Sequence, residues 1–153
     1  MVRVDVSNVI ARPVQEVWDF FVDLTNSPRW TRSGSELRQT SEGPLGVGST
    51  VESVRPLFGR EIKSQRMVAT AFEPPQLISF TADVKLLGRI VGGFTFESVD
   101  KGTRLSRWTE ADLGRGERLL APLLVRVVRR FQRTELANLK RLIEDQPSPA
   151  ASG

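Results

Sequence analysis

The side chains that most often carry acid–base chemistry are missing from this sequence. It contains no histidine, no cysteine and no tyrosine, which removes the commonest general base, the thiol nucleophile and the phenolic acid. Proton transfer would have to use carboxylates, lysine, arginine, hydroxyls or water. Glu110 and Asp112 lie two residues apart, but such a pair is more typical of solvated carboxylates than of a catalytic site. We expect no metal site and no cofactor, because no Asp/Glu cluster has suitable spacing.

Binding chemistry is better represented than catalytic chemistry. Large apolar side chains and two arginines fall at positions where a sheet and a helix could enclose a small molecule. The candidate ligand-binding residues are Trp18, Phe21, Trp30, Arg66, Phe94, Phe96, Leu105, Arg107, Leu124 and Val128. For Trp18 and Phe21 we favour packing in the core, since helical spacing predicts burial without any function. Trp30 fits either role equally well.

Arg107 is the polar candidate of greatest interest. Strand alternation places it on one face with Leu105, beside the face that Phe94 and Phe96 share on the preceding strand. If this face is concave, Arg107 points beneath the long helix that closes the domain. A buried arginine is costly unless it is paired.

Several arrangements would satisfy Arg107. A polar or anionic ligand group could pair with it, as could Glu97 or Asp83. A register shift of one residue would instead expose Arg107 and bury Trp108. We favour exposure or pairing within the protein over a ligand anchor, and Arg66 presents the same alternatives.

The elements that would position these residues follow from hydrophobic periodicity. Alternating valines predict a strand over residues 2–11, and an apolar stripe predicts a helix from Pro13 to Asp23, followed by a short helix that carries Trp30. The further predicted strands cover residues 37–40, 49–55, 61–72, 77–84, a segment containing Phe94 and Phe96 after Gly92-Gly93, and 103–111. Short connections indicate that the strands are antiparallel.

The C-terminal third predicts one long helix over residues 117–145. Pro122 should kink it or mark a short preceding helix. The predicted buried stripe consists of Leu120, Leu124, Val127, Val128, Phe131, Leu136, Leu139, Leu142 and Ile143. We therefore expect a single domain at 1–145 and a disordered Pro/Ala/Ser-rich tail at 146–153.

The net charge of +4 is concentrated in that last helix. Residues 115–145 carry eight Lys/Arg and four Asp/Glu, so the rest of the chain is neutral. The side chains that share one helical face are Arg126, Arg129, Arg130 and Arg133. This face could make weak peripheral contact with an anionic membrane, but the solvent side of an amphipathic helix is the simpler interpretation. No aromatic residues interleave with the arginines, which argues against nucleic acid.

Several segments resemble a known superfamily. They are VIARPVQEVWDFFVDLTNSPRW, GPLGVGSTVESV, VATAFEPPQLISF, FTFESVDKGTRLS and the closing LANLKRLIED. In this order they are similar to the START/Bet v 1-like (SRPBCC) superfamily, in its bacterial polyketide cyclase/dehydrase-like branch. The resemblance implies an α+β helix-grip fold, in which a curved antiparallel sheet of about seven strands wraps around a long C-terminal helix, with two short helices after the first strand.

The resemblance implies a cavity but no shared catalytic signature. The function we expect is binding of a hydrophobic small molecule or lipid between the sheet and the helix. The alternatives are a cofactor-independent polyketide cyclase or dehydratase and a protein-interaction module without a ligand. Arg3 and Asp5 interrupt the apolar run that a signal peptide needs, so a cytoplasmic location is expected. The oligomeric state stays open.

Overall fold

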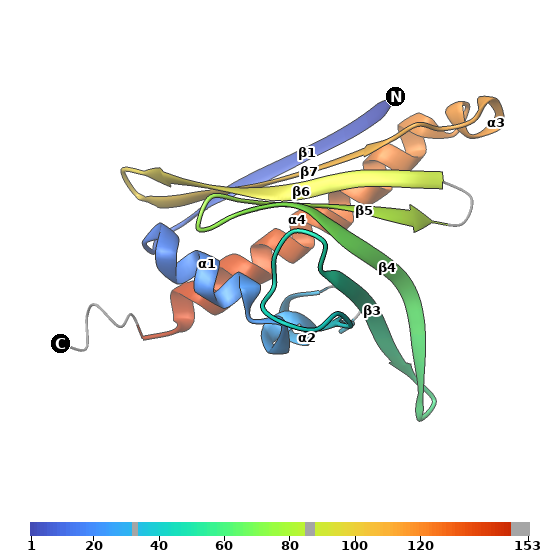
Figure 1. The fold of residues 1–153 in the computed structure, drawn as a ribbon. Helices are drawn as coiled ribbons and strands as arrows, with labels where there is room; N and C mark the ends of the chain where they lie inside the picture. Colours follow the sequence, from blue (N-terminus) through green and yellow to red (C-terminus); the bar gives the residue numbers. More distant parts are fainter. Residues whose placement is uncertain (32–33, 85–87, 148–153) are drawn as a thin grey trace.

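In the computed structural model, which describes residues 1–31, 34–84 and 88–147, one antiparallel sheet curves around a long helix (Figure 1). The described residues form seven strands in the order β1-β7-β6-β5-β4-β3-β2. Their bounds are β1 (Val2–Ile10), β2 (Glu36–Gln39), β3 (Thr50–Leu57), β4 (Arg60–Glu73), β5 (Leu77–Val84), β6 (Gly88–Val99) and β7 (Gly102–Ala111). The predicted α+β helix-grip fold is confirmed.

The helices lie where the periodicity predicts them. Their bounds are α1 (Val14–Val22), the 3-10 helix η1 (Leu24–Asn26), α2 (Ser27–Trp30), α3 (Arg115–Arg118) and α4 (Ala121–Asp145). A separate α3 confirms that Pro122 marks a short preceding helix rather than a kink within one helix. Of the predicted tail, residues 148–153 lie outside the described part of the chain.

Two irregularities bend the sheet and make room beneath α4. The pairing of β3 with β4 shifts at Ser53/Val54, and that of β4 with β5 shifts between Ala69 and Ala71. Such bulges increase local twist and bend the strand that contains them. Figure 1 shows the result, with β3 and β4 turning away from the plane of the other strands.

Gly92 and Gly93 lie within β6 and not before it, which corrects the predicted start of that strand. Gly93 pairs with Trp108 of β7. A Cβ atom at Gly93 would collide with the Trp108 ring and lie 2.5 Å from the Ile78 carbonyl oxygen. Close approach of neighbouring groups, and not a turn, therefore explains the glycine at this position.

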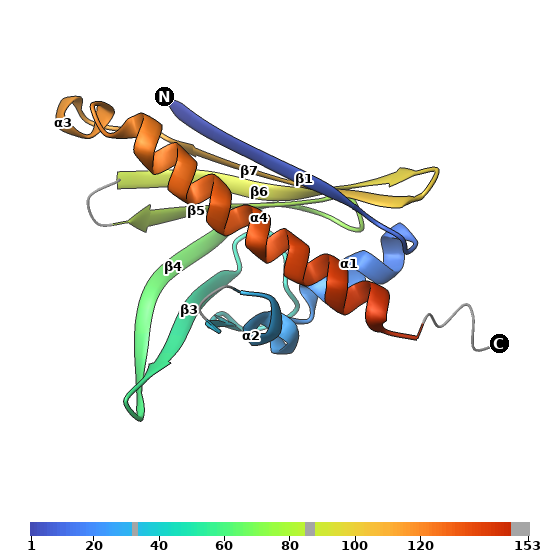
Figure 2. The ribbon, with the colours of Figure 1, turned by 180° about the vertical axis from the view of Figure 1, so that it is seen from behind.

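The closely packed core lies around α1 and the C-terminal half of α4. Its buried apolar residues are Val4, Val6, Ile10, Val17, Trp18, Phe20, Phe21, Trp30, Phe94, Phe96, Leu105, Leu136, Leu139 and Ile143. Figure 2 shows α4 crossing the face of the sheet, with α1 beside its C-terminal half. Side-chain hydrogen bonds fix that half to β1: Asn8 Nδ2 donates to the Leu136 carbonyl at 2.9 Å, and Lys140 Nζ donates to the Val9 carbonyl at 2.6 Å.

The predicted stripe on α4 is correct in its second half and correct only in part before it, where Val128 is half-buried against the core. Leu120, Val127 and Phe131 are 57%, 39% and 39% exposed, so the prediction that they are buried is wrong. Before Gln132, α4 has no fully buried side chain among the described residues.

Candidate ligand cavity

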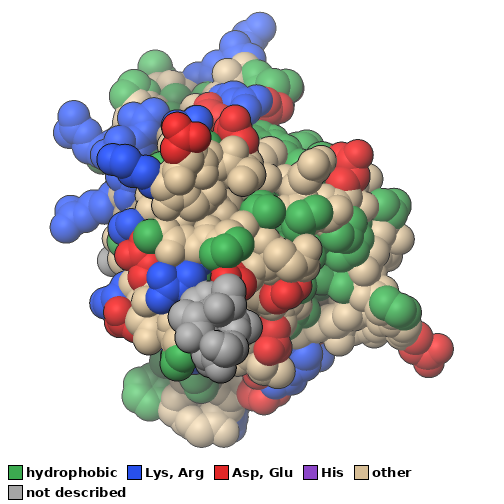
Figure 3. Space-filling model, turned by 90° about the vertical axis from the view of Figure 1, so that its left-hand side faces the viewer, with side chains coloured by type: hydrophobic (Ala, Val, Ile, Leu, Met, Phe, Trp, Pro, Cys, Tyr) green, Lys and Arg blue, Asp and Glu red, His purple; other side chains and the backbone are tan. Residues whose placement is uncertain are grey.

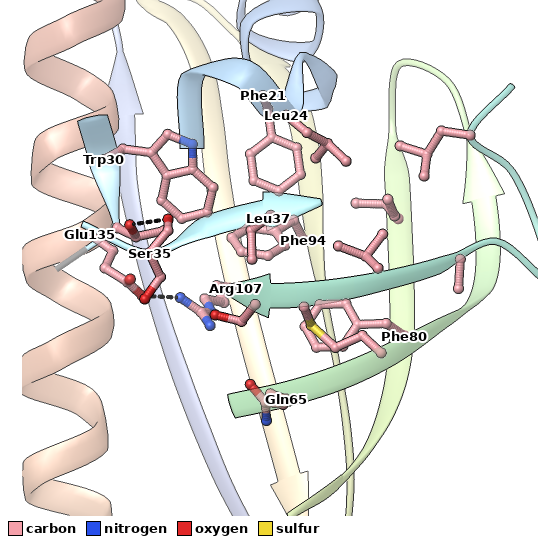
Figure 4. Close-up of a pocket in the computed structure, with 17 residues that line it drawn as sticks. Phe21, Leu24, Trp30, Ser35, Leu37, Gln65, Phe80, Phe94, Arg107 and Glu135 are labelled. Atoms are coloured by element: carbon pink, nitrogen blue, oxygen red, sulfur yellow. Dashed lines mark hydrogen bonds and ion pairs between the residues drawn. The ribbon is translucent and has the colours of Figure 1, made fainter. Parts of the chain in front are cut away.

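A cavity of about 230 Å³ lies between the bent strands and α4. Aromatic walls come from Phe21, Trp30, Phe80 and Phe94. Aliphatic walls come from Leu24, Leu37, Leu45, Val51, Met67 and Ile78. Figure 4 shows the labelled apolar side chains, such as Phe21, Leu37 and Phe94, pointing toward a common space, with α4 along one side.

A second cavity of about 220 Å³ adjoins the first under the N-terminal half of α4. Its apolar walls include Val4, Ile90, Leu124, Val125 and Val128. Both cavities are lined by Gln65, Met67, Phe80 and Arg107. Because these four residues border both spaces, we treat the two cavities as two lobes of one site that meet at Arg107.

Arg107 is held in place from two sides. Its Nη1 donates to Glu135 Oε1 of α4 at 2.7 Å, and its guanidinium carbon lies 5.0 Å from the centre of the Phe94 ring. The side chains of Arg107 and Glu135 are 18% and 17% exposed. A charged pair in so little water is strongly oriented, and the aromatic ring adds a cation–π contact. Figure 4 shows the pair beside the cavity.

Unused hydrogen-bonding capacity remains next to this pair. Gln132 Nε2 donates to Thr109 Oγ1 at 2.7 Å, but no described group donates to Gln132 Oε1, and none accepts from Arg107 Nε, although both atoms are buried. Buried polar atoms are normally satisfied. A ligand with an acceptor for Arg107 and a donor for Gln132 would satisfy them.

Six of the ten predicted ligand-binding residues line the site. Phe21, Trp30, Phe94 and Arg107 line the first lobe, and Leu124 and Val128 line the second. Phe21 and Trp30 also belong to the core, so packing and cavity lining are not exclusive at these positions.

The other four predicted residues do not line either lobe. Trp18, Phe96 and Leu105 are at most 4% exposed and are packed in the core. Trp18 belongs to α1, and its ring contacts Phe96 of β6. Arg66 is exposed, because the register of β4 turns its neighbours Gln65 and Met67 toward the cavity.

Arg107 faces inward as strand alternation predicts, opposite Phe94. Of the two favoured interpretations, exposure and pairing within the protein, the structure shows the second, but the suggested partners are wrong. Glu97 pairs with Arg104 at 3.5 Å and Asp83 with Arg89 at 3.4 Å, both on the surface. The register of β7 turns Arg107 toward α4, and its partner is therefore Glu135 of that helix.

Sequence reasoning missed Glu135 and Gln132. Both are polar residues at the place where the apolar stripe of α4 changes direction, between Phe131 and Leu136. Polar side chains inside an apolar helical stripe are a usable signal, since such residues must find partners when buried.

The predicted acids Glu110 and Asp112 lie away from the cavity walls. Glu110 pairs with Arg3 at 2.6 Å, and Asp112 is 75% exposed. Within the described ranges, no three acidic side chains come together in a way that could hold a metal ion. No helix in those ranges is long and apolar enough to cross a bilayer.

A curved antiparallel sheet with a long C-terminal helix across its face, and a cavity between them, places the protein in the helix-grip class. Over residues 1–144 the sequence matches the family described as polyketide cyclase/dehydrase and lipid transport, and the chain belongs to this family. This match confirms the resemblance to the polyketide cyclase/dehydrase-like branch of the START/Bet v 1-like superfamily. No curated protein matches the sequence.

Solved structures of similar proteins support the fold. A protein from Thermus thermophilus has a TM-score of 0.70 at 16% identity, covering 92% of this chain and 96% of that chain. Ara h 8.0201 has a TM-score of 0.73 at 12% identity, covering 94% of this chain and 98% of that chain. The di-domain ARO/CYC StfQ from the steffimycin biosynthetic pathway has 0.73 at 16% identity, covering 94% of this chain and 51% of that chain. At these identities the likeness establishes the fold alone.

Proposed function

We propose that the two-lobed cavity binds an elongated, largely apolar small molecule or lipid whose polar group lies beside Arg107. The observation that carries this proposal is the combination of apolar walls with one oriented ion pair at the junction of the lobes. A few fixed polar groups among apolar walls are typical of ligand sites. The family description includes lipid transport, which agrees with this chemistry.

The lobe volumes set the size of the ligand. A dry cavity of about 150 Å³ lined by apolar side chains is sufficient to bind benzene. The first lobe, at about 230 Å³, therefore accepts an aromatic ring with substituents, and the second lobe accepts a similar group. Removing apolar area from water supplies affinity at about 25 cal/mol per Å², before the costs of binding.

Two fluorescent compounds test the proposal directly. Anilinonaphthalene sulfonate carries apolar rings and an anion, whereas N-phenyl-1-naphthylamine has similar rings and no charge. We expect both to bind with micromolar dissociation constants and blue-shifted emission. Arg107→Met should weaken the anionic compound about tenfold or more, since a hydrogen bond to a charged group is worth about 1.5–3 kcal/mol, and should change the neutral compound little.

A matched pair of substitutions on β4 separates the cavity from the outer surface. Ala69→Phe places a ring in the first lobe, while Val68→Phe adds a ring to the adjacent residue, which is 38% exposed. The first variant should reduce affinity at least tenfold and the second should not. Leu45→Trp, at a loop residue in the cavity wall, repeats the test if Ala69→Phe does not fold. Equal affinity in all variants would refute a ligand in this cavity.

The position of Glu135 favours a second candidate, a cyclase or dehydratase without a cofactor. A carboxylate beside an arginine in an apolar cavity could accept a proton from the carbon between two carbonyls, while the arginine stabilises the enolate. The cavity would hold a poly-β-keto chain in a folded conformer. Turnover of a poly-β-keto thioester above the rate in buffer, abolished by Glu135→Gln, supports the enzyme. Binding without turnover would support the carrier. Absence of both binding and turnover would support an interaction module.

A further inference from the structure

Several large apolar side chains are exposed to solvent at the N-terminal end of α4. Among the described residues of this helix, the fully buried side chains begin only at Gln132. Leu119, Leu120 and Leu123 are 85%, 57% and 59% exposed, and Val127 is 39% exposed. Leu119 and Leu120 immediately precede α4, and Leu123 and Val127 lie about one turn apart on its exposed surface. We call these four exposed residues the apolar strip.

Arginines lie directly beside this strip. Arg126, Arg130 and Arg133 are exposed, and none of them forms an ion pair with another residue in the described ranges. Residues 118–134 contain five arginines and no aspartate or glutamate. Figure 3 shows Lys and Arg side chains gathered at the upper left, on the side of the molecule that carries α4. We call these three arginines and the four apolar residues the Leu–Arg surface.

We propose that the Leu–Arg surface docks onto an anionic lipid bilayer. A helix with an apolar strip and basic residues beside it lies in the plane of the interface, where its apolar face enters the acyl boundary and its cations meet lipid phosphates. The exposed leucines would enter the acyl boundary, and the arginines would contact the lipid phosphates. This activity goes beyond ligand binding in the cavity and does not require it.

The charges favour a bilayer over the other possible partners. A symmetric dimer through this surface would bring the same patch of two copies together and oppose their arginines, which is unfavourable. Nucleic acid would engage the arginines but leave the leucines in water. An anionic bilayer satisfies both parts of the surface together.

Docking would also bring the cavity close to the lipid. Leu124, Val125 and Val128 lie on the same turns of α4 as the exposed strip, but they line the second lobe. One helical segment therefore has a face toward the cavity and a face toward the proposed bilayer. This arrangement would suit transfer of an apolar molecule between them.

Sedimentation with lipid vesicles tests docking. The full chain is mixed with vesicles of phosphatidylcholine alone or with 30% phosphatidylglycerol, at low and at high salt. We expect binding only to the anionic vesicles and weakening by salt. Leu123→Glu should abolish binding. Arg126→Gln, Arg130→Gln and Arg133→Gln together should weaken it roughly a hundredfold, at about fivefold per arginine.

Control variants remove the same groups from other surfaces. Arg55→Gln, Arg60→Gln and Lys101→Gln together delete three exposed charges elsewhere, and Phe58→Asn deletes the 95% exposed phenylalanine of the β3–β4 turn. Both should retain binding. Equal loss in the controls, or equal binding to neutral vesicles, would overturn the proposal. A dimer in analytical ultracentrifugation that Leu123→Glu converts to a monomer, without vesicle binding by the wild type, would assign the surface to a second copy.

Discussion

The Arg107–Glu135 pair should contribute little net stability, although breaking it from one side should destabilise the fold. A buried ion pair is strongly destabilising to break from one side, by about 3–5 kcal/mol, but often neutral to replace entirely with apolar residues. Exposed pairs contribute only about 0–1 kcal/mol. With side chains 18% and 17% exposed, this pair lies nearer the buried limit. We expect Arg107→Met and Glu135→Leu each to lose about 2 kcal/mol.

The double variant is the decisive measurement. Arg107→Met with Glu135→Leu removes both charges of this pair, so its free energy of unfolding should lie within about 1 kcal/mol of the wild type. Urea titration followed by tryptophan fluorescence measures all four proteins, with Trp30 beside the site as a reporter. Each single variant should also melt about 4–8 °C lower, at about 2–4 °C per kcal/mol for a domain of this size.

The same double variant separates stability from function. It should bind N-phenyl-1-naphthylamine like the wild type and bind anilinonaphthalene sulfonate about tenfold more weakly. If the double variant instead loses the sum of the two single losses, the two charges are not coupled. The reasoning that assigns the pair to ligand orientation would then be refuted.

Three further changes test other parts of the structure. Gly93→Ala should destabilise the fold by about 2–3 kcal/mol, because the new methyl group meets Trp108 and backbone atoms of β5, whereas Gly46→Ala has open space and should change it by less than about 0.5 kcal/mol in the same urea assay. Phe58 has a φ of 50°, a conformation that favours asparagine over an aromatic residue, so Phe58→Asn should stabilise by about 0.5–1 kcal/mol in thermal unfolding. Hydrogen bonds from Lys140 and from the Ala11 N–H lower the pKa of Glu144. Its contribution to stability is therefore complete above the unfolded-state pKa of about 4.3 and is lost as pH falls through the lower folded value. The difference in urea midpoint between the wild type and Glu144→Gln should be larger at pH 7 than at pH 3.

Local periodicity predicts most of the fold because it depends only on near neighbours in sequence. The alternation around Phe94 and Arg107 also places both side chains on the inner face correctly. The choice of Gln65 over Arg66 as the cavity residue depends on the register of β4. That register is set together with the bulges that bend β3 and β4, and local period does not encode them.

The cavity itself depends on long-range pairing. Glu135 lies 28 residues from Arg107 in sequence, and no short motif links the two. The apolar stripe of α4 predicts burial along its whole length, yet side chains are fully buried only from Gln132 onward. Periodicity shows that a helix has an apolar face, but not whether a core, a ligand or a bilayer covers it.

Burial divides α4 at Gln132 into two parts. After this residue, Leu136, Leu139 and Ile143 are fully buried, and hydrogen bonds connect this part to β1. Before it, the helix forms one wall of a cavity and has no fully buried side chain among the described residues. Local opening is easier where few apolar contacts are buried.

Amide hydrogen exchange should therefore resolve the two parts of the helix. We expect the amides of residues 125–131 to exchange at least tenfold faster than those of residues 136–143, although both lie in one continuous helix. Saturation with N-phenyl-1-naphthylamine should slow exchange mainly in the first part, because Leu124 and Val128 line the second lobe. Equal protection of both parts without the compound would mean that the cavity does not loosen this half of α4.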